Sequence, residues 1–198
     1  MKNFSREDAM FYIKGFNQPV DDGIYDSLVN FMVIANRLNA FTCESCHGHV
    51  DWIFSYPNIS FGVRHSHQRR VPFWNVYQLY RKHKNKREIN STLEKRVEDI
   101  IFFLTREILL FHQNNKTDPH LLFSVVRTND FNFRLVAAFP YYSRGLRKAG
   151  MFEQLEQLMT EQRAVLKKLS ETILEKVETI SSLDGINRCD CDVCRMKH

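Results

Sequence analysis

Residues 151–183 read MFEQLEQLMTEQRAVLKKLSETILEKVETISSL, the longest stretch with helical spacing in this chain. Leucine, methionine, isoleucine and valine recur every three or four positions along it, and glutamate and lysine occupy the opposite face. Such a stripe is typical of a helix that buries one face against a core. The spacing therefore predicts a long helix over 151–183, with Gly185 placed to end it as a C-cap residue.

A second apolar stripe runs through residues 91–111, behind Ser91-Thr92-Leu93-Glu94, which has the form of a capping box. This stripe predicts a core helix that begins near Ser91. Shorter helices are predicted from Ser5, where Asp8 completes a similar box, over 24–39, over 73–86, and from Asp118-Pro119 towards Arg127.

Extended structure is indicated in only two places. Ser60 to Val63 is one short piece, and the alternation of apolar residues over 131–137 is the other. The second piece has no obvious partner strand in the sequence, and Pro140 ends it. The pattern therefore predicts an all-α fold, a compact helical bundle with a long C-terminal helix and a tail rich in cysteine and histidine.

Length and composition indicate one domain with a small appendage. The chain has 198 residues, of which 43% are apolar, enough to bury a core. We expect a helical domain over 1–185 and a separate tail over 186–198. Arg6, Glu7 and Asp8 stand where a secretion signal needs an apolar run. We therefore expect an intracellular protein, cytoplasmic or nuclear, that does not associate with membranes.

The five cysteines fall into two clusters, and histidine accompanies each cluster. The first reads Cys43-Glu44-Ser45-Cys46-His47-Gly48-His49, and the second contains Cys189, Cys191 and Cys194 with His198. In a reducing compartment such spacings favour metal or redox sites over structural disulfides. Thiolates and imidazoles from one tight turn can share a tetrahedral zinc ion without strain. The clusters therefore predict bound zinc.

Several arrangements of the metal remain open. Cys43 and Cys46 can combine with a nearby histidine, or they can join Cys191 and Cys194 in a four-thiolate clasp that attaches the tail to the domain. One zinc ion, two zinc ions and redox-active pairs are all compatible with the spacing. The candidate ligands are Cys43, Cys46, His49, Cys189, Cys191, Cys194 and His198.

The stretch around the first cluster resembles the FAD-dependent sulfhydryl oxidases of the Erv/ALR type. Residues 28–39 form a helix that leads into the CxxC motif, His49 follows its second cysteine, and Tyr56-Pro57 comes later. The resemblance implies a thiol oxidoreductase that uses Cys43 and Cys46, with Cys189 and Cys191 as a shuttle pair. The tryptophan and histidine with which that family contacts flavin are missing from residues 8–15.

A basic segment lies in the middle of the chain. Residues 52–87 contain eight lysines and arginines and no acidic residue, and aromatic side chains lie between them. Cations neutralise phosphates and aromatic rings stack on bases, so the mixture suits single-stranded nucleic acid or RNA. A solvated helix face or a surface for an acidic protein would use the same residues. The candidate nucleic-acid-binding residues are Arg64, Arg69, Arg70, Trp74, Arg81, Lys82, Lys84 and Arg87.

No glycine-rich phosphate loop, HExxH motif or GxSxG motif is present in the sequence. We therefore predict a zinc-stabilised intracellular binding protein that is nucleic-acid-associated or regulatory and is not an enzyme. The alternative is the FAD-dependent thiol oxidase that the resemblance implies.

Overall fold

The fold combines helices with an antiparallel sheet, so the predicted all-α class is wrong. The computed structural model describes residues 4–15, 20, 22–38, 40–50, 56–63, 86–128 and 132–179. Its elements are α1 (Arg6–Lys14), η1 (Asp22–Ile24), α2 (Tyr25–Arg37), β1 (Ala40–Cys46), β2 (Asn58–Val63), α4 (Lys86–Asn115), η3 (Pro119–Leu121), β3 (Phe123–Arg127), β4 (Asn132–Ala137), α5 (Pro140–Lys148) and α6 (Phe152–Thr179).

Four strands form one sheet in the order β1-β2-β4-β3, and every neighbouring pair is antiparallel. The hairpin of β3 and β4 lies beside β2 although α4 separates these segments in the sequence. Phe61 pairs with Phe133, and Ile59 pairs with Leu135. Residues directly opposite one another share a face, so these four apolar side chains line one side of the sheet. Ser60 and Arg134 pair on the other side, where Arg134 Nε donates to Ser60 Oγ over 2.7 Å.

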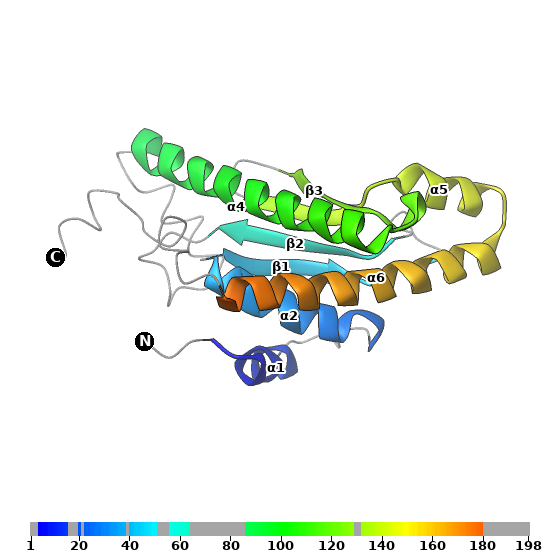
Figure 1. Ribbon diagram of the computed structural model, residues 1–198, viewed down its shortest axis with the longest axis horizontal. Coiled ribbons are helices and arrows are strands. Elements are labelled where there is room, and N and C mark those ends of the chain that lie inside the picture. Colours follow the sequence, from blue (N-terminus) through cyan, green and yellow to red (C-terminus); the bar gives the residue numbers. More distant parts are fainter. Residues whose placement is uncertain are drawn as a thin grey trace.

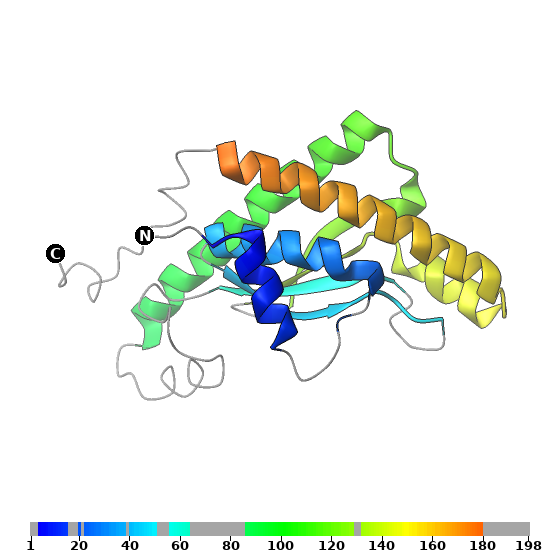
Figure 2. The same cartoon turned by 90° about the horizontal axis from the view of Figure 1, so that it is seen from below.

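The helices gather on the apolar side of the sheet. Helix α2 packs on β1 and helix α4 packs on β3, while α6 contacts both of these helices. Figure 2 shows α2, α4 and α6 together above the strands, and α1 crosses the outer side of α2. Among the described residues, no helix combines the length and apolarity that a bilayer crossing requires.

The centre of the core is a group of phenylalanines between α2 and the sheet. Phe31, Phe61 and Phe133 are each 1% exposed. The ring of Phe61 stacks on that of Phe133 at a centroid distance of 5.0 Å and meets that of Phe31 edge-on at 5.7 Å. Edge-on and stacked pairs are the arrangements that aromatic rings prefer. These contacts join α2, β2 and β4 into one unit.

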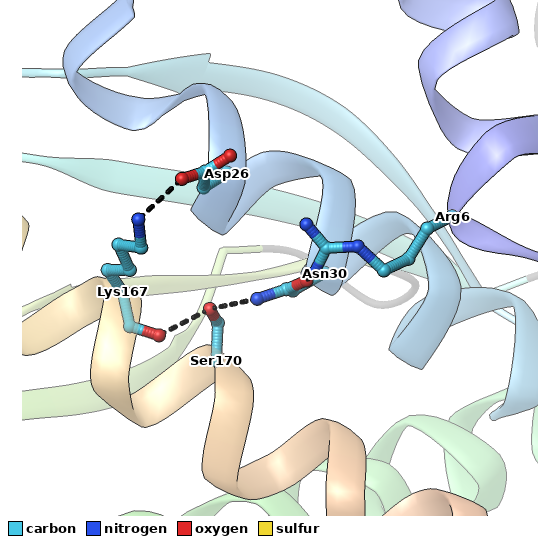
Figure 3. Close-up of polar contacts among 5 residues, drawn as sticks. All are labelled: Arg6, Asp26, Asn30, Lys167 and Ser170. Carbon is cyan, nitrogen blue, oxygen red and sulfur yellow. Dashed lines mark hydrogen bonds and ion pairs between the residues drawn. The ribbon is translucent and has the colours of Figure 1, made fainter.

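A buried polar contact connects α2 to α6. Asn30 and Ser170 are both completely buried, and Asn30 Nδ2 donates to Ser170 Oγ over 2.9 Å (Figure 3). Arg6 of α1 donates to Asn30 Oδ1, and Lys167 forms an ion pair with Asp26 over 2.5 Å. A buried amide without partners would cost free energy, so these hydrogen bonds select one register between α2 and α6.

Several local predictions are confirmed and others are wrong. The capping box of Ser5 and Asp8 is present at the start of α1. The predicted helix start at Ser91 is wrong, because α4 begins at Lys86 and runs through it. The helix predicted from Asp118 is also wrong. Asp118 caps only the short η3 turn, and β3 follows at once because its strand partner β4 supplies the hydrogen bonds. The expected helix over 73–86 and the expected tail over 186–198 lie outside the described residues, apart from the first residue of α4.

His112 joins the end of α4 to the start of β3. Its side chain is 7% exposed, and its Nε2 accepts a hydrogen bond from the Phe123 amide over 2.9 Å. An imidazole nitrogen that accepts a hydrogen bond carries no proton, so the ring is neutral with its proton on Nδ1. Burial lowers the pKa of His112 below its ordinary value.

We expect His112 to make the folded state less stable in mild acid. The unfolded chain takes up a proton as pH falls through about 6.5, whereas the folded chain does so only at lower pH, so stability decreases over that interval. The His112→Gln variant keeps a hydrogen-bond acceptor for the Phe123 amide but does not titrate. Urea unfolding at pH 7.5, 6.5 and 5.5 should show a slope up to about 1.4 kcal/mol per pH unit steeper in the wild type. His120→Gln, which removes an exposed imidazole, is the control. Equal slopes for wild type and His112→Gln would contradict the assignment.

Candidate functional site

The cysteine and histidine turn lies at the end of β1, packed against α6. A β-bulge between Thr42 and Ser45 contains Cys43, whose side chain lies outside the described part of the structure. Cys46 is the last residue of β1 and is half-buried. The Gly48 amide donates to Cys46 Sγ at 3.4 Å. An N–H donor at sulfur favours the thiolate, which is the form that binds metals or attacks disulfides.

Gly48 is the residue that allows the turn to approach α6 so closely. Its φ is +87°, a conformation that side chains disfavour. A Cβ atom at this position would lie 2.8 Å from Met159 Sδ and 3.0 Å from the carbonyl carbon of Tyr56. The glycine is therefore required both by the backbone conformation and by the lack of space.

The two histidines of the turn lie side by side. The rings of His47 and His49 have a centroid distance of 4.4 Å and an interplanar angle of 45°. Both line a pocket of about 500 Å³ between η1, the turn and α6. The remaining lining residues are Asp22, Gly23, Gly48, Val50, Glu156 and Arg163.

The charges on the α6 wall of this pocket are paired. Arg163 donates to Glu156 Oε1 over 2.7 Å and to Thr160 Oγ1 over 2.8 Å. The stem of Arg163 lies against Gly23, whose Cβ position is 3.0 Å from Arg163 Cδ. The α6 wall therefore presents an ion pair to the pocket, in which the Glu156 carboxylate balances the charge of the Arg163 guanidinium.

The described residues do not complete a metal site by themselves. Within residues 4–179, apart from the undescribed gaps, no three cysteine, histidine or acidic side chains are grouped to hold a metal ion. The turn brings Cys46, His47 and His49 together in the sequence, and the side chain of the other predicted ligand of this cluster, Cys43, is not described. The predicted ligands of the tail, Cys189, Cys191, Cys194 and His198, lie outside the described residues.

The predicted nucleic-acid-binding residues also lie mostly outside the described part. Arg64, Arg69, Arg70, Trp74, Arg81, Lys82 and Lys84 belong to the undescribed residues 64–85. Arg87 is in the first turn of α4, but its side chain is not described. The structure therefore neither groups nor separates these residues.

Sequence reasoning missed the acidic and cationic wall of the pocket. Asp22 belongs to Asp21-Asp22-Gly23, which is a clear turn signal, but nothing local indicates that the turn faces Glu156 and Arg163. Helix α5 was missed as well, because Pro140 is expected to end a strand. Proline is also favoured in the first turn of a helix, which is where it lies in α5.

Fold and site together define a mixed α/β protein with an antiparallel sheet and a thiol- and imidazole-bearing turn. Comparison of this chain with protein families, with curated proteins and with solved structures finds no match.

Proposed function

We propose that this protein is a zinc-stabilised intracellular binding protein that associates with nucleic acid and is not an enzyme. The observation that carries the proposal is the turn from Cys46 to His49. There one sulfur and two imidazoles lie within four residues, and a backbone N–H donates to the sulfur. Thiolate and imidazole are the ligands that structural zinc prefers.

The donor set fits zinc if further ligands join the turn. Structural zinc takes four ligands in a tetrahedral arrangement. Cys46 and His49 supply two of them in this proposal, with His47 as an alternative to His49. Cys43 and the cysteines of the tail supply the others. Bound zinc then adds stability by linking β1 to chain segments that are remote in sequence.

Nucleic-acid association is proposed from the charge of residues 52–87. That segment contains eight cations and no acid, and it leads into α4, which begins with Lys86 and Arg87. Phosphate contacts supply most of the non-specific affinity for nucleic acids, so a local excess of cations is the required feature.

We expect removal of zinc to destabilise the protein, because binding free energy at a structural site contributes to folding free energy. Protein purified reduced and without chelator should contain zinc by elemental analysis, and a chelator should lower its Tm. The Cys46→Ser, Cys191→Ser and Cys194→Ser variants should each lose zinc and stability, and Cys189→Ser should lose less if two CxxC pairs form the clasp. His120→Gln, away from the turn, should keep its zinc. Absence of zinc from the wild-type protein would overturn the proposal.

A thiol oxidase that uses FAD is the second candidate. The N–H that donates to Cys46 Sγ favours this candidate too, because thiol oxidation also begins from a thiolate. The same purified sample separates the two functions. A yellow protein with flavin absorbance and thiol-dependent oxygen consumption would establish the oxidase, and a colourless zinc-containing protein supports the binding protein.

A further inference from the structure

Helix α5 presents an outer face of tyrosine and basic residues at one end of the molecule. Figure 1 shows α5 at the opposite end from the start of α4, where the basic segment joins. Ser143 and Leu146 are buried on the inner side of α5, which packs on α6. Tyr141 is 79% exposed, and the guanidinium of Arg144 lies 5.7 Å from the centre of its ring.

The segment that carries this face is aromatic and basic in sequence. Acidic residues of other elements lie near α5, because Asp118 and Glu161 line a pocket together with Tyr142 and Leu146. From Phe139 to Phe152 the sequence contains three cations and no aspartate or glutamate. Phe139, Met151 and Phe152 at the two ends of α5 are between 41% and 52% exposed. The three cations of the segment make an anionic ligand the complementary one for its exposed face.

The glycine at position 145 is a second, independent indication that a ligand approaches this face of α5. It lies within α5, one helical turn from both Tyr141 and Lys148, and its φ is not positive. A Cβ atom placed there would meet nothing within 4 Å among the described residues. Glycine inside a helix is less stable than alanine, and neither the backbone nor the packing of this helix requires it. A bare backbone between a tyrosine and a lysine allows a flat ligand to approach closely.

We propose that the face formed by Tyr141, Arg144, Gly145 and Lys148 binds single-stranded nucleic acid. Tyr141 stacks on an exposed base, and Arg144 and Lys148 contact the flanking phosphates. The base approaches over Gly145. This proposal deepens the nucleic-acid association proposed above and rests on it for the class of ligand, but it assigns a separate surface.

A membrane surface fits this face less well. A helix that lies in a bilayer interface keeps its apolar residues on one side and its cations on the other. On α5 the cations Arg144 and Lys148 share the exposed side with Tyr141, while the aliphatic side chain of Leu146 faces the protein. Insertion of Tyr141 would therefore carry two cations with it.

The test uses the full chain and labelled single-stranded RNA and DNA at two salt concentrations. Tyr141→Ala should weaken binding about 5- to 150-fold, the range expected for loss of one stacked base, and should leave the salt dependence unchanged. The double variant Arg144→Ala/Lys148→Ala should flatten the slope of log affinity against log salt by about 1.4. Phe102→Ala and Lys168→Ala/Lys176→Ala are matched controls on exposed parts of α4 and α6, and they should bind like the wild type.

Gly145→Ala separates binding from folding. It should raise the Tm by about 1–4 °C, because alanine stabilises a helix relative to glycine. It should also weaken binding, because the methyl group occupies the approach to Tyr141. A more stable protein that binds less well is not the result of a general folding defect. Unchanged affinity in both Gly145→Ala and Tyr141→Ala would overturn the proposal.

The variant Arg81→Ala/Lys82→Ala/Lys84→Ala/Arg87→Ala distinguishes nucleic-acid binding at α5 from nucleic-acid binding at the basic segment 52–87. If it loses binding while the α5 variants do not, the basic segment is the site and the α5 proposal fails. If the α5 variants lose binding and this variant does not, the α5 proposal holds and the role of the basic segment fails. Binding of each variant to vesicles with anionic lipids and to a polyglutamate peptide is measured in the same way. If Tyr141→Ala weakens binding to the vesicles or to the peptide but not to nucleic acid, the α5 proposal is overturned.

Discussion

Replacing Phe61 by alanine should lower the free energy of unfolding by about 3–5 kcal/mol. Phe61 is 1% exposed in β2, one of the two inner strands of the sheet, and its ring contacts both Phe31 of α2 and Phe133 of β4. Removal of the ring leaves a cavity at the junction of three elements, because the surrounding side chains relax only partly into the space. The loss therefore includes both the transfer free energy of the ring and the cost of the cavity.

Urea denaturation followed by circular dichroism measures this effect. Phe102→Ala is the matched control, because Phe102 is 72% exposed on α4 and the same atoms are removed from water-facing surface. The control should change the free energy of unfolding by no more than about 0.5 kcal/mol. Equal losses in the two variants would mean that the phenylalanine group is not the centre of the core.

Replacing Gly48 by alanine should lower the free energy of unfolding by about 2–5 kcal/mol. About 1–2 kcal/mol of this comes from forcing a side chain into a left-handed conformation, since φ is +87°. A further loss of about 1–3 kcal/mol comes from overpacking. The new Cβ would lie 2.8 Å from Met159 Sδ and 3.1 Å from the amide nitrogen of Tyr56, and the Tyr56 backbone cannot move as a side-chain end can.

Gly150→Ala isolates the contribution of the clash. Gly150 also has a positive φ, +71°, but a Cβ atom there meets nothing within 4 Å among the described residues. Its replacement should therefore cost only the conformational part, about 1–2 kcal/mol. The difference between the two variants in thermal or urea unfolding reports the contact between the turn and α6. A difference near zero would show that the turn is not packed as tightly as the geometry requires.

The helical half of the fold is largely predictable from the sequence. Helix α6, Phe152–Thr179, lies within the predicted stretch 151–183, and its members Leu155, Leu166 and Ile173 are all fully buried. The predicted end of this helix near Gly185 lies outside the described residues. Contacts within a helix lie three or four residues apart, so the pattern that forms α6 is contained within α6 itself. Gln162 interrupts the stripe and is nevertheless buried, because its amide donates to the His120 carbonyl over 3.1 Å. That partner is forty-two residues away and no local pattern shows it.

The sheet is the part that sequence reasoning did not find, although it identified pieces of two strands. Ser60–Val63 lies in β2, and the alternation over 131–137 corresponds to β4. What was missing is their pairing, because about seventy residues, including α4, separate them. A strand is stabilised by hydrogen bonds to a neighbour and not by its own residues, so an isolated alternating segment does not reveal its partner.

The sequence by itself determined the chemistry of the turn and the faces of the long helices. Cys46, His47 and His49 supply a thiol and two imidazoles wherever the turn lies, and the periodicity of α6 selects its buried face. Only the tertiary structure decided that β2 lies beside β4 and that η1 and α6 bring Asp22 and Glu156 to the histidines. It also decided that the tyrosine and cations of α5 face outward. The physical reason is the sequence separation of the interacting residues. Side-chain chemistry and helical periodicity depend on neighbours in the chain. Strand register and pocket walls depend on segments that meet only after the core has packed.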